Sequence, residues 1–516
     1  MEKTSNSEME QSTTSTKPMY YLLALVLLVG ITSAWVLANL DVGMLWQDEG
    51  ETACVSRTVL TEGIPKGTDG INFYSQQEGR EYGVNHEWKL HPWFQFYWLA
   101  IFLALFESTT FVARFPFALL GIGTVILGFL LARRLWKDEK TAWLVAIAFL
   151  LNVMFLLLVR QARYYAPVMF FALYATWGLL DILERKKIGF VHYILGSLLF
   201  FQSQYLFTLN FWIASLIYTG LFYKDRLKEV GGAIAIAALP SIPFLIWILD
   251  TPYGETLTQS ASSEGLAYGL KRFGTAFFDG IMEPIWLMAL VPLFFLKDNL
   301  KKWSITKESE RILVFFLLMI VGNIVAIALL VPEYYIRYLC VTIPFALLLK
   351  GRIGGWLANI HIAIPVVVLL AVAAYKGDVA NYWKEVKNES FIGPMESMVN
   401  FIQKEVDPSS KVAISFGDLP LKYYLPNYKI YGGLAGDLPE NLDDMDVIVV
   451  RRNSIDKMDQ KVQIRLYEYI QANSDKFQPY TLKVEDTPFQ NRETLTEHYY
   501  ETVPVTNPLV LYKRNQ

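Results

Sequence analysis

The sequence predicts a mostly α-helical, polytopic membrane protein of about eleven transmembrane helices, followed by a C-terminal α/β domain. Hydrophobic residues make up 53% of the 516 residues and aromatic residues 15%, more than a soluble chain usually carries. Many apolar stretches approach 20 residues, about the length that crosses a bilayer. Charge is also uneven: residues 1–375 carry 57 of the 95 charged side chains, and residues 376–516 carry the other 38.

The candidate spans follow one another along residues 19–375. The first, Met19–Leu40, contains small residues as a secretion signal does, but its apolar part is too long for one, so we predict an uncleaved anchor. Residues 1–18, rich in Ser, Thr and Glu, predict a disordered cytoplasmic tail. The eleven spans are predicted to begin near Met19, Phe115, Thr141, Ala166, Gly189, Thr208, Val230, Phe277, Ile312, Ile336 and Gly354.

A further apolar stretch, residues 92–106, is too short to cross a bilayer and is predicted to lie along the outer membrane surface. With this assignment 19 of the 29 Lys and Arg in residues 1–375 face the cytoplasm and 10 face outward. Basic residues in short loops favour the cytoplasmic side. We therefore expect a multi-pass protein of the cytoplasmic (inner) membrane with its N-terminus inside and residues 376–516 outside, in the periplasm or extracellular space.

Residues 376–516 alternate short apolar runs with helical patterns. Runs at 411–416, 446–450 and 509–512 predict strands, and 395–405 and 461–472 predict helices. A small α/β domain follows from this order. It contains neither a GxGxxG nor a P-loop pattern, so the sequence gives no support for a nucleotide site there.

The loop at residues 41–114 is far longer than a connector needs to be, and long loops of this kind often carry function. Residues 41–91 hold nine carboxylates and two His. Asp48 and Glu49 form an adjacent acidic pair soon after the first span. This pair is either the start of a solvated loop or a catalytic carboxylate with its neighbour.

Several cations lie at predicted outer boundaries of spans, where the positive-inside rule does not place them. Each needs an anionic partner, and a lipid-linked phosphate would supply one, because guanidinium binds phosphate oxygens through two parallel hydrogen bonds. Lipid headgroups or acids of the first loop could equally pair with any single one. The candidate substrate-binding residues are Arg57, His91, Arg114, Arg160, Arg163 and Arg337.

His86 and Glu87 could contribute to a divalent metal site, although the sequence leaves open whether a metal binds. No other cofactor is implied. The two cysteines, Cys54 and Cys340, have no zinc or cluster spacing and cannot form a disulfide framework. A net charge of −3 and the lack of a long basic run exclude nucleic acid as an expected partner.

These motifs, in this order, resemble the GT-C superfamily of integral-membrane glycosyltransferases, in particular the protein O-mannosyltransferase and aminoarabinose (lipid A) transferase branch. The acidic pair and a downstream Ser-Arg stand in DEGETACVSRTVL, and a His-Pro motif leads into the interfacial segment HPWFQFYWLAIF. An Arg-x-Pro-x-Ala motif opens the next span in ARFPFALLG, and the span closes on LARRLWKDEKTAWL. The resemblance covers residues 19 to about 180, and RQARYY and IRY match more loosely.

The chain departs from the family pattern at two places. It has His91-Pro92-Trp93 where the family often has two prolines, and Leu90 where some relatives have a metal-coordinating acid. The WWDYG signature of oligosaccharyltransferases is absent, which argues against transfer of whole oligosaccharides to Asn.

The resemblance implies a GT-C fold and a cell-envelope enzyme of glycan biosynthesis. It would transfer one sugar from a polyprenyl-phosphate donor to a hydroxyl of a lipid, glycan or protein at the outer face of the membrane. Asp48 would be the base, and Glu49 would orient the acceptor or a metal. Direct displacement would invert the anomeric centre.

Three other classes remain open. A lipid-linked-glycan flippase or transporter would show repeat symmetry, broken helices and charges within spans. An O-antigen polymerase or ligase would depend on later loops instead of the early acidic pair. A non-enzymatic assembly subunit would use its outer domain to bind a partner.

Overall fold

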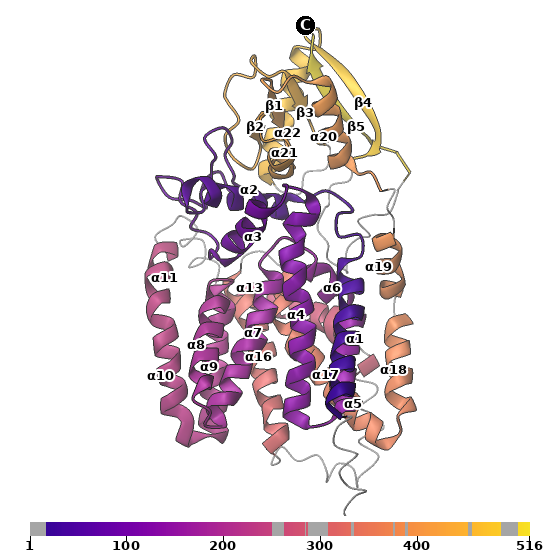
Figure 1. Cartoon of the computed structure of the whole chain (residues 1–516). Helices are drawn as coiled ribbons and strands as arrows, with labels where there is room; N and C mark the ends of the chain where they lie inside the picture. The colour runs from indigo at the N-terminus through magenta and orange to yellow at the C-terminus, as the bar shows by residue number, and fades with distance from the viewer. Residues whose placement is uncertain are drawn as a thin grey trace, which may run out of the picture.

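The computed structural model describes residues 17–249, 263–283, 285–286, 308–331, 335–374, 377–387, 391–451, 457–486 and 504–515. In these ranges the chain forms a bundle of long helices with a smaller β-sheet domain at one end (Figure 1). The domain boundary predicted at residues 375 and 376, and nearly all of the predicted tail, lie outside the described residues.

The bundle contains most of the helices. Its α-helices are α1 (Lys17–Leu37), α4 (Thr110–Trp136), α5 (Glu139–Leu151), α6 (Val153–Val159), α7 (Tyr165–Leu183), α8 (Ile188–Phe201), α9 (Tyr205–Phe222), α10 (Leu227–Ala238), α11 (Ile242–Leu249), α13 (Ser263–Ala276), α16 (Glu308–Leu330), α17 (Thr342–Ile360), α18 (Ala363–Ala374) and α19 (Asp378–Lys387). Short 3-10 or π turns are η1 (Lys224–Arg226), η2 (Leu239–Ser241), η3 (Phe277–Met282) and η4 (Ile336–Val341).

Apolar composition predicted where the helices of the bundle begin better than it predicted how many of them span the membrane. Ten of the eleven predicted starts lie within five residues of the start of an α-helix or of a 3-10 or π turn. Among the described residues, five helices are long and apolar enough to cross a membrane, or up to seven if each bent pair is one span. A multi-pass, mostly helical protein is therefore confirmed, and the exact number of eleven is not. Most of the span predicted from Phe277 falls outside the described residues.

The start predicted at Gly354 for the last span is wrong. Gly354 lies inside α17, and the next helix, α18, begins at Ala363. The glycines of α17 serve close packing: an added Cβ at Gly351 would lie 2.1 Å from the Val145 side chain, and one at Gly355 would lie 2.0 Å from the Thr141 hydroxyl. Small residues here let α17 approach α5 instead of marking a helix boundary.

The span predicted from Thr141 is broken at Asn152. Helices α5 and α6 meet there at 70°, and the Asn152 side chain caps α6 by accepting from the Phe155 N–H. Its amide donates to the carbonyl of Gly280 and to Glu283, which forms a buried ion pair with Lys350 of α17. The chain thus contains a broken helix and a buried ion pair, two features that the sequence alone did not show clearly.

The first loop, residues 41–114, contains two helices, α2 (Gln47–Glu62) and α3 (Phe94–Leu105), which lie between the sheet and the ends of the long helices (Figure 1). Helix α3 lies within the predicted interfacial segment 92–106. Its 12 residues extend only about 18 Å, too short to cross a bilayer. It packs against α2 and α4.

Residues after 391 form the small α/β domain that the sequence predicted. Its sheet has the order β2-β1-β3-β5-β4, with β1, β2 and β3 parallel and β5 and β4 antiparallel to their neighbours. The strands are β1 (Lys411–Ile414), β2 (Lys429–Gly432), β3 (Val447–Val449), β4 (Phe477–Glu485) and β5 (Pro508–Arg514). The helices are α20 (Pro394–Glu405), α21 (Asp418–Tyr424) and α22 (Lys457–Ala472).

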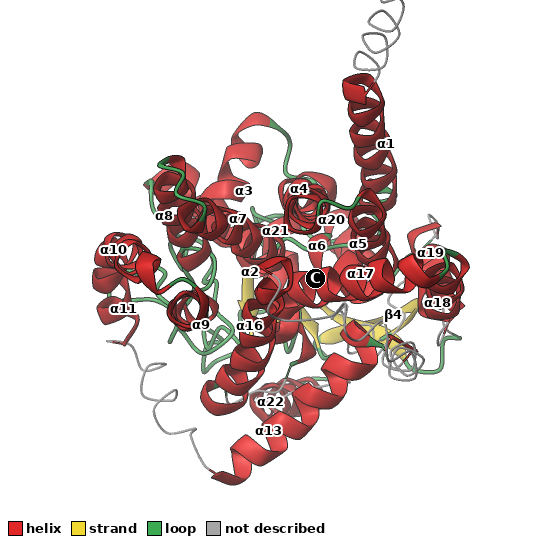
Figure 2. Ribbon diagram, turned by 90° about the horizontal axis from the view of Figure 1, so that it is seen from below, coloured by secondary structure: helices red, strands yellow, loops and turns green. Residues whose placement is uncertain are grey.

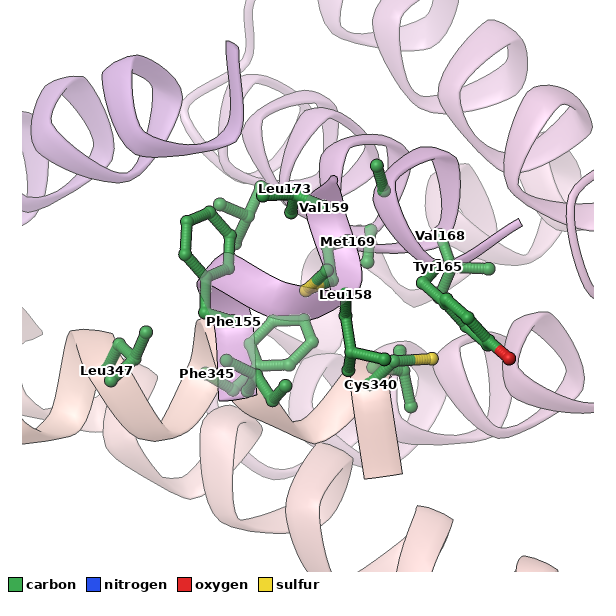
Figure 3. Close-up of a cluster of buried hydrophobic side chains, with 14 of the residues drawn as sticks. Phe155, Leu158, Val159, Tyr165, Val168, Met169, Leu173, Cys340, Phe345 and Leu347 are labelled. Atoms are coloured by element: carbon green, nitrogen blue, oxygen red, sulfur yellow. The ribbon is translucent and has the colours of Figure 1, made fainter. Parts of the chain in front are cut away.

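Side chains at the centre of the bundle are buried, whereas many at its periphery are exposed. All seven residues of α6 are buried, and Figure 3 shows its side chains packed with those of α7, η4 and α17, including Phe155, Met169 and Phe345. Helix α1 lies at the periphery when the bundle is viewed from the end away from the sheet (Figure 2). Its Leu22, Leu23 and Val26 side chains are exposed, as expected for a lipid-facing helix.

Candidate functional site

Helix α2 is the element that positions the predicted acids. It begins immediately after Trp46 with two acids in its first turn, where the helix dipole favours negative charge. It ends at Gly63, which adopts the left-handed conformation (φ 76°) and donates to the Val59 carbonyl. Although the helix is polar, 11 of its 16 residues are buried, so nearly every side of it contacts protein.

Because residues three and four apart share a helix face, the acids of α2 face two directions. Asp48 and Glu51 lie on one face, and a single amide joins them. The Gln76 Nε2 atom lies 3.2 Å from Asp48 Oδ1 and 2.6 Å from Glu51 Oε2. Glu49 points elsewhere.

Two arginines from distant segments neutralise this acidic face. Arg163 forms an ion pair with Glu51 and lies 3.8 Å from Asp48, measured from Nε to Oδ2. Arg337 lies 3.4 Å from the same Asp48 oxygen. The structure thus joins three predicted site residues, Asp48, Arg163 and Arg337. With Glu51, Gln76 and His91 we call them the Asp48 cluster.

Arg163 belongs to the short connection between α6 and α7. Besides its ion pair with Glu51, its Nη1 donates to the Thr52 hydroxyl at 3.1 Å and to the Asp48 carbonyl at 3.3 Å. Its Nε is buried, and no described residue accepts a hydrogen bond from it. This donor lies 3.8 Å from the Asp48 carboxylate, a distance greater than a hydrogen bond.

Arg337 is surrounded by aromatic rings. Its guanidinium lies 4.0 Å from the Tyr335 ring centroid, 5.3 Å from Trp46 and 5.7 Å from Tyr338. The Trp46 ring is held by its indole N–H, which donates to Gln161. Cation–π contacts of this kind hold a guanidinium without neutralising it, so the positive charge of Arg337 remains directed at Asp48.

His91 completes the Asp48 cluster from the start of the α3 segment. Its ring stacks between Trp88 and Tyr164. Burial, with a smaller contribution from Arg163, holds the pKa of His91 well below its usual range, so the ring is neutral near pH 7. Arg163 can only donate, so the His91 Nε2, 3.4 Å away, accepts. The proton then sits on Nδ1, 3.6 Å from Glu51.

The contacts of Glu49 and Arg114 differ from those expected for their predicted roles. They form a fully buried pair in which Arg114 Nε and Nη2 each donate at 2.8 Å to Glu49. Arg114 Nη1 donates to the carbonyls of Leu40, Val42 and Gly43. Glu49 also accepts from the Ala162 N–H. All three guanidinium nitrogens of Arg114 donate to protein acceptors, so the structure gives Arg114 and Glu49 a structural role. Substrate binding by Arg114 and orientation of an acceptor by Glu49 stay predictions. The pair anchors α2 to the bundle.

Arg160 and Arg57 also have structural partners. Arg160 donates to the carbonyl of Val36 in the last turn of α1 and to those of Ala38 and Asn39 just after it, so it caps that helix. Arg57 donates to the Tyr423 carbonyl and lies 4.0 Å from that ring. These contacts give the two arginines structural roles, and their predicted contact with a donor phosphate stays a prediction.

His86 and Glu87 lie outside the Asp48 cluster. His86 has a positive φ of 63° and packs between the rings of Phe73 and Tyr82. Among the described residues, no three His, Cys, Asp or Glu side chains come together in a group that could hold a metal.

Sequence reasoning missed Glu51 and Gln76. The signal for Glu51 was available, because in DEGE the acids at positions 48 and 51 share a helix face once the segment is assigned as a helix. Gln76 has no local signal, since its loop reaches α2 only through the fold. Another acid of the same loop, Glu81, accepts from the Ser75 hydroxyl and the Gln76 N–H. Burial raises the pKa of Glu81 to about 7.

Comparison with known proteins gives the fold a counterpart. No protein-family model matches the sequence, and no curated protein sequence matches it. The crystal structure of ArnT from Cupriavidus metallidurans bound to undecaprenyl phosphate is similar, with a TM-score of 0.54 and 13% identity over 94% of this chain and 97% of that chain. The apo state of that ArnT gives 0.54 and 13%, over 96% and 98%.

A third structure is less similar. The archaeal oligosaccharyltransferase AglB from Archaeoglobus fulgidus, in complex with an inhibitory peptide and a dolichol-phosphate, gives a TM-score of 0.43 at 11% identity, over 84% of this chain and 69% of that chain. This likeness is too low to bear on the fold. The likeness to ArnT, nearly complete over both chains, shows that this chain shares the fold of that protein, as the resemblance to the aminoarabinose transferase branch predicted.

Proposed function

We propose that this chain is a glycosyltransferase that moves one sugar from a polyprenyl-phosphate donor to a hydroxyl of a lipid, glycan or protein. The observation that carries the proposal is the Asp48 cluster, in which a buried carboxylate lies between two arginines from distant segments. Perturbed charge groups gathered in one place are typical of catalytic sites. The shared fold with a polyprenyl-phosphate-bound ArnT supports the donor class.

In this proposal Arg163 and Arg337 form the donor-phosphate cradle. Arg163 presents a buried Nε with no hydrogen-bond acceptor among the described residues, and His91 presents a buried Nδ1 in the same condition. Buried donors of this kind are stabilised when a ligand oxygen accepts from them. A phosphate oxygen at this position would also gain the charge of both arginines.

Asp48 is proposed as the base. The acceptor oxygen forms a bond to the anomeric carbon while the bond from that carbon to the phosphate oxygen breaks. The hydroxyl proton passes to the Asp48 carboxylate, and the electron pair of the broken bond stays on the polyprenyl phosphate. Positive charge from Arg163 and Arg337 stabilises this leaving group without protonating it. Attack opposite the phosphate inverts the anomeric centre.

Glu51 and Gln76 then have positioning roles in place of the role first assigned to Glu49. Glu51 pairs with Arg163 and fixes its fork, while Gln76 donates to both carboxylates. We place the Asp48 cluster at the outer face of the cytoplasmic membrane, because the 19-to-10 distribution of basic residues favours that orientation.

The test uses purified protein in detergent, a synthetic polyprenyl-phosphate sugar and a panel of hydroxyl acceptors. We expect transfer with inversion by the parent, and a loss of about 10²- to 10⁴-fold in kcat for Asp48→Asn, with donor binding retained. Glu87→Gln, in the same loop but outside the cluster, is the control. If Asp48→Asn stays within about tenfold of the parent, the base lies elsewhere.

A lipid-linked-glycan flippase is the second candidate, favoured by the break at Asn152 and the buried Glu283–Lys350 pair, which are typical of transporters. The double variant Glu283→Gln with Lys350→Met separates the two. A transferase should retain turnover in it, whereas a flippase that uses this pair should lose movement of a labelled glycolipid across vesicles.

A further inference from the structure

Helix α2 has three faces with three different partners. Asp48 and Glu51 face the Asp48 cluster, and Glu49 faces Arg114 of α4. The third face carries positions 47, 50, 54 and 57, whose spacings of three, four and three residues place them in one row. This row contacts α21 of the C-terminal domain.

The contact of α2 with α21 begins beside the proposed base. Gln47, the residue before Asp48, donates from Nε2 to Asp418 Oδ1 at 2.9 Å. Asp418 also accepts from Lys422 Nζ at 2.7 Å, and Lys422 donates at 2.7 Å to the Phe73 carbonyl of the first loop. Asp418 and Lys422 have fully buried side chains. A buried pair of this kind holds a defined geometry, because either charge alone would be costly to bury.

The backbones of α2 and α21 are in close contact at Gly50. An added Cβ there would lie 2.6 Å from the backbone nitrogen of Pro420 and 2.8 Å from the carbonyl carbon of Leu419. These are main-chain atoms, so they cannot move aside as a flexible side chain could. Only glycine allows this separation of the two helices.

Further contacts extend the same interface on both sides. Cys54 Sγ lies 3.5 Å from the Leu419 carbonyl, and Arg57 donates at 2.7 Å to the Tyr423 carbonyl. The Tyr424 hydroxyl accepts from the Leu45 N–H at 3.0 Å, just before α2 begins. One seven-residue helix therefore contacts α2 from just before its first residue to Arg57 in its third turn.

We propose that the C-terminal domain is a positioning element of the catalytic centre, which acts through α21 to fix α2 and thereby the place of Asp48. Gln47, Gly50, Asp418 and Lys422 are the positioning residues. The proposal rests on the proposed function for its catalytic consequence, and on the α2–α21 contact for its structural part. The domain then contributes to turnover without touching the substrate.

The first test introduces a methyl group into the contact. Gly50→Ala is compared with Gly220→Ala, a helical glycine of α9 where an added Cβ meets nothing within 4 Å. Alanine favours helix more than glycine does, so helix propensity alone would stabilise α2. Displacement by the methyl group predicts the opposite, namely faster hydrogen exchange in α2 peptides and a fall of about 10²-fold in kcat, because a shift of about 1 Å costs that much. Donor KM should change little.

The second test exchanges the hydrogen-bonding groups of Gln47 and Asp418, which lie beside Lys422. Gln47→Glu places a second carboxylate against Asp418, and Asp418→Asn leaves Lys422 without its charge partner. The double variant restores one carboxylate and one amide with the hydrogen bond reversed. We expect each single variant to lose at least about tenfold in kcat and the double variant to recover most of it, a coupling that independent effects do not give.

The outcomes separate the two proposals. A parent protein that transfers no sugar contradicts the proposed function, whereas α2 exchange still tests the contact without any turnover. Parent-like exchange in Gly50→Ala overturns the structural part of the inference. Faster exchange with parent-like kcat, or a double variant no better than the worse single one, overturns the positioning role.

Discussion

Arg163 and Arg114 are both buried arginines paired with glutamates, yet we expect different responses to substitution. Arg163→Lys keeps the charge and loses the planar fork, so turnover should fall about 10²-fold while the protein stays folded. Arg114→Ala leaves Glu49 buried without its partner, which should cost about 3–5 kcal/mol of stability. Denaturation temperature and kcat measured on both variants separate the roles. Stable, inactive Arg114→Ala would return that residue to the site.

Glu81 should make the stability of the protein depend on pH. Its folded pKa of about 7 lies above the ordinary value of 4.5, so between these values the folded state binds more protons than the unfolded state. Stability therefore falls as pH rises from about 4.5 to 7, by on the order of 3 kcal/mol in total, and this contribution is constant above that window.

The pH prediction is checked with Glu81→Gln, which keeps the shape of the side chain and removes its titration. Denaturation temperatures between pH 5 and 8 should fall more steeply for the parent than for the variant. Parallel curves for the two proteins would show that Glu81 titrates alike in the folded and unfolded states.

At single positions, the sequence indicated which residues carry suitable chemical groups better than it indicated which groups those residues contact. Asp48, Arg163 and Arg337 were chosen because acids and guanidinium groups stood at predicted membrane boundaries, and the structure brings them together. Arg114 and Arg160 satisfied the same criterion, but main-chain carbonyls at the end of α1 and just after it accept from them. Such carbonyls leave no trace in side-chain identity, so no sequence pattern distinguishes the two kinds of arginine.

Among the elements, the break between α5 and α6 depends on long-range contacts. Asn152 caps α6 and donates to Glu283, whose charge is held by Lys350. Lys350→Met should leave Glu283 buried and unpaired, lowering stability by about 3–5 kcal/mol, whereas the double variant with Glu283→Gln should lose much less. Denaturation temperature in detergent measures both. Equal losses in the single and double variants would mean that the pair has no net coupling.

Apolar length predicted most helix starts, because a single long apolar stretch can satisfy all its backbone hydrogen bonds in lipid only as a helix. It failed at Asn152 and Gly354 for one physical reason. An asparagine can cap a new helix or hydrogen-bond within a bundle, and a glycine can end a helix or permit close packing. The choice is made by residues far along the chain, Glu283 for the first and Leu144 for the second.

At the scale of the whole molecule, the sequence predicted two parts but not their contact. The interface between α2 and α21 joins residues about 370 positions apart, and local periodicity contains no information at that distance. Because α21 contacts α2 directly, the C-terminal domain must lie on the same side of the membrane as Asp48.

That requirement gives the last prediction, which concerns orientation. Asp444, in the C-terminal domain, and Asp225, at the turn before α10, have side chains that are 77% and 60% exposed, so Asp444→Cys and Asp225→Cys should both present reactive thiols. The native Cys54 and Cys340 are fully buried, and burial raises the pKa of Cys54 to about 12, which keeps its reactive thiolate scarce. With an impermeant maleimide on intact cells, Asp444→Cys should be labelled and Asp225→Cys only after permeabilisation. The reverse pattern would place the Asp48 cluster in the cytoplasm and would contradict the orientation inferred from the basic loops.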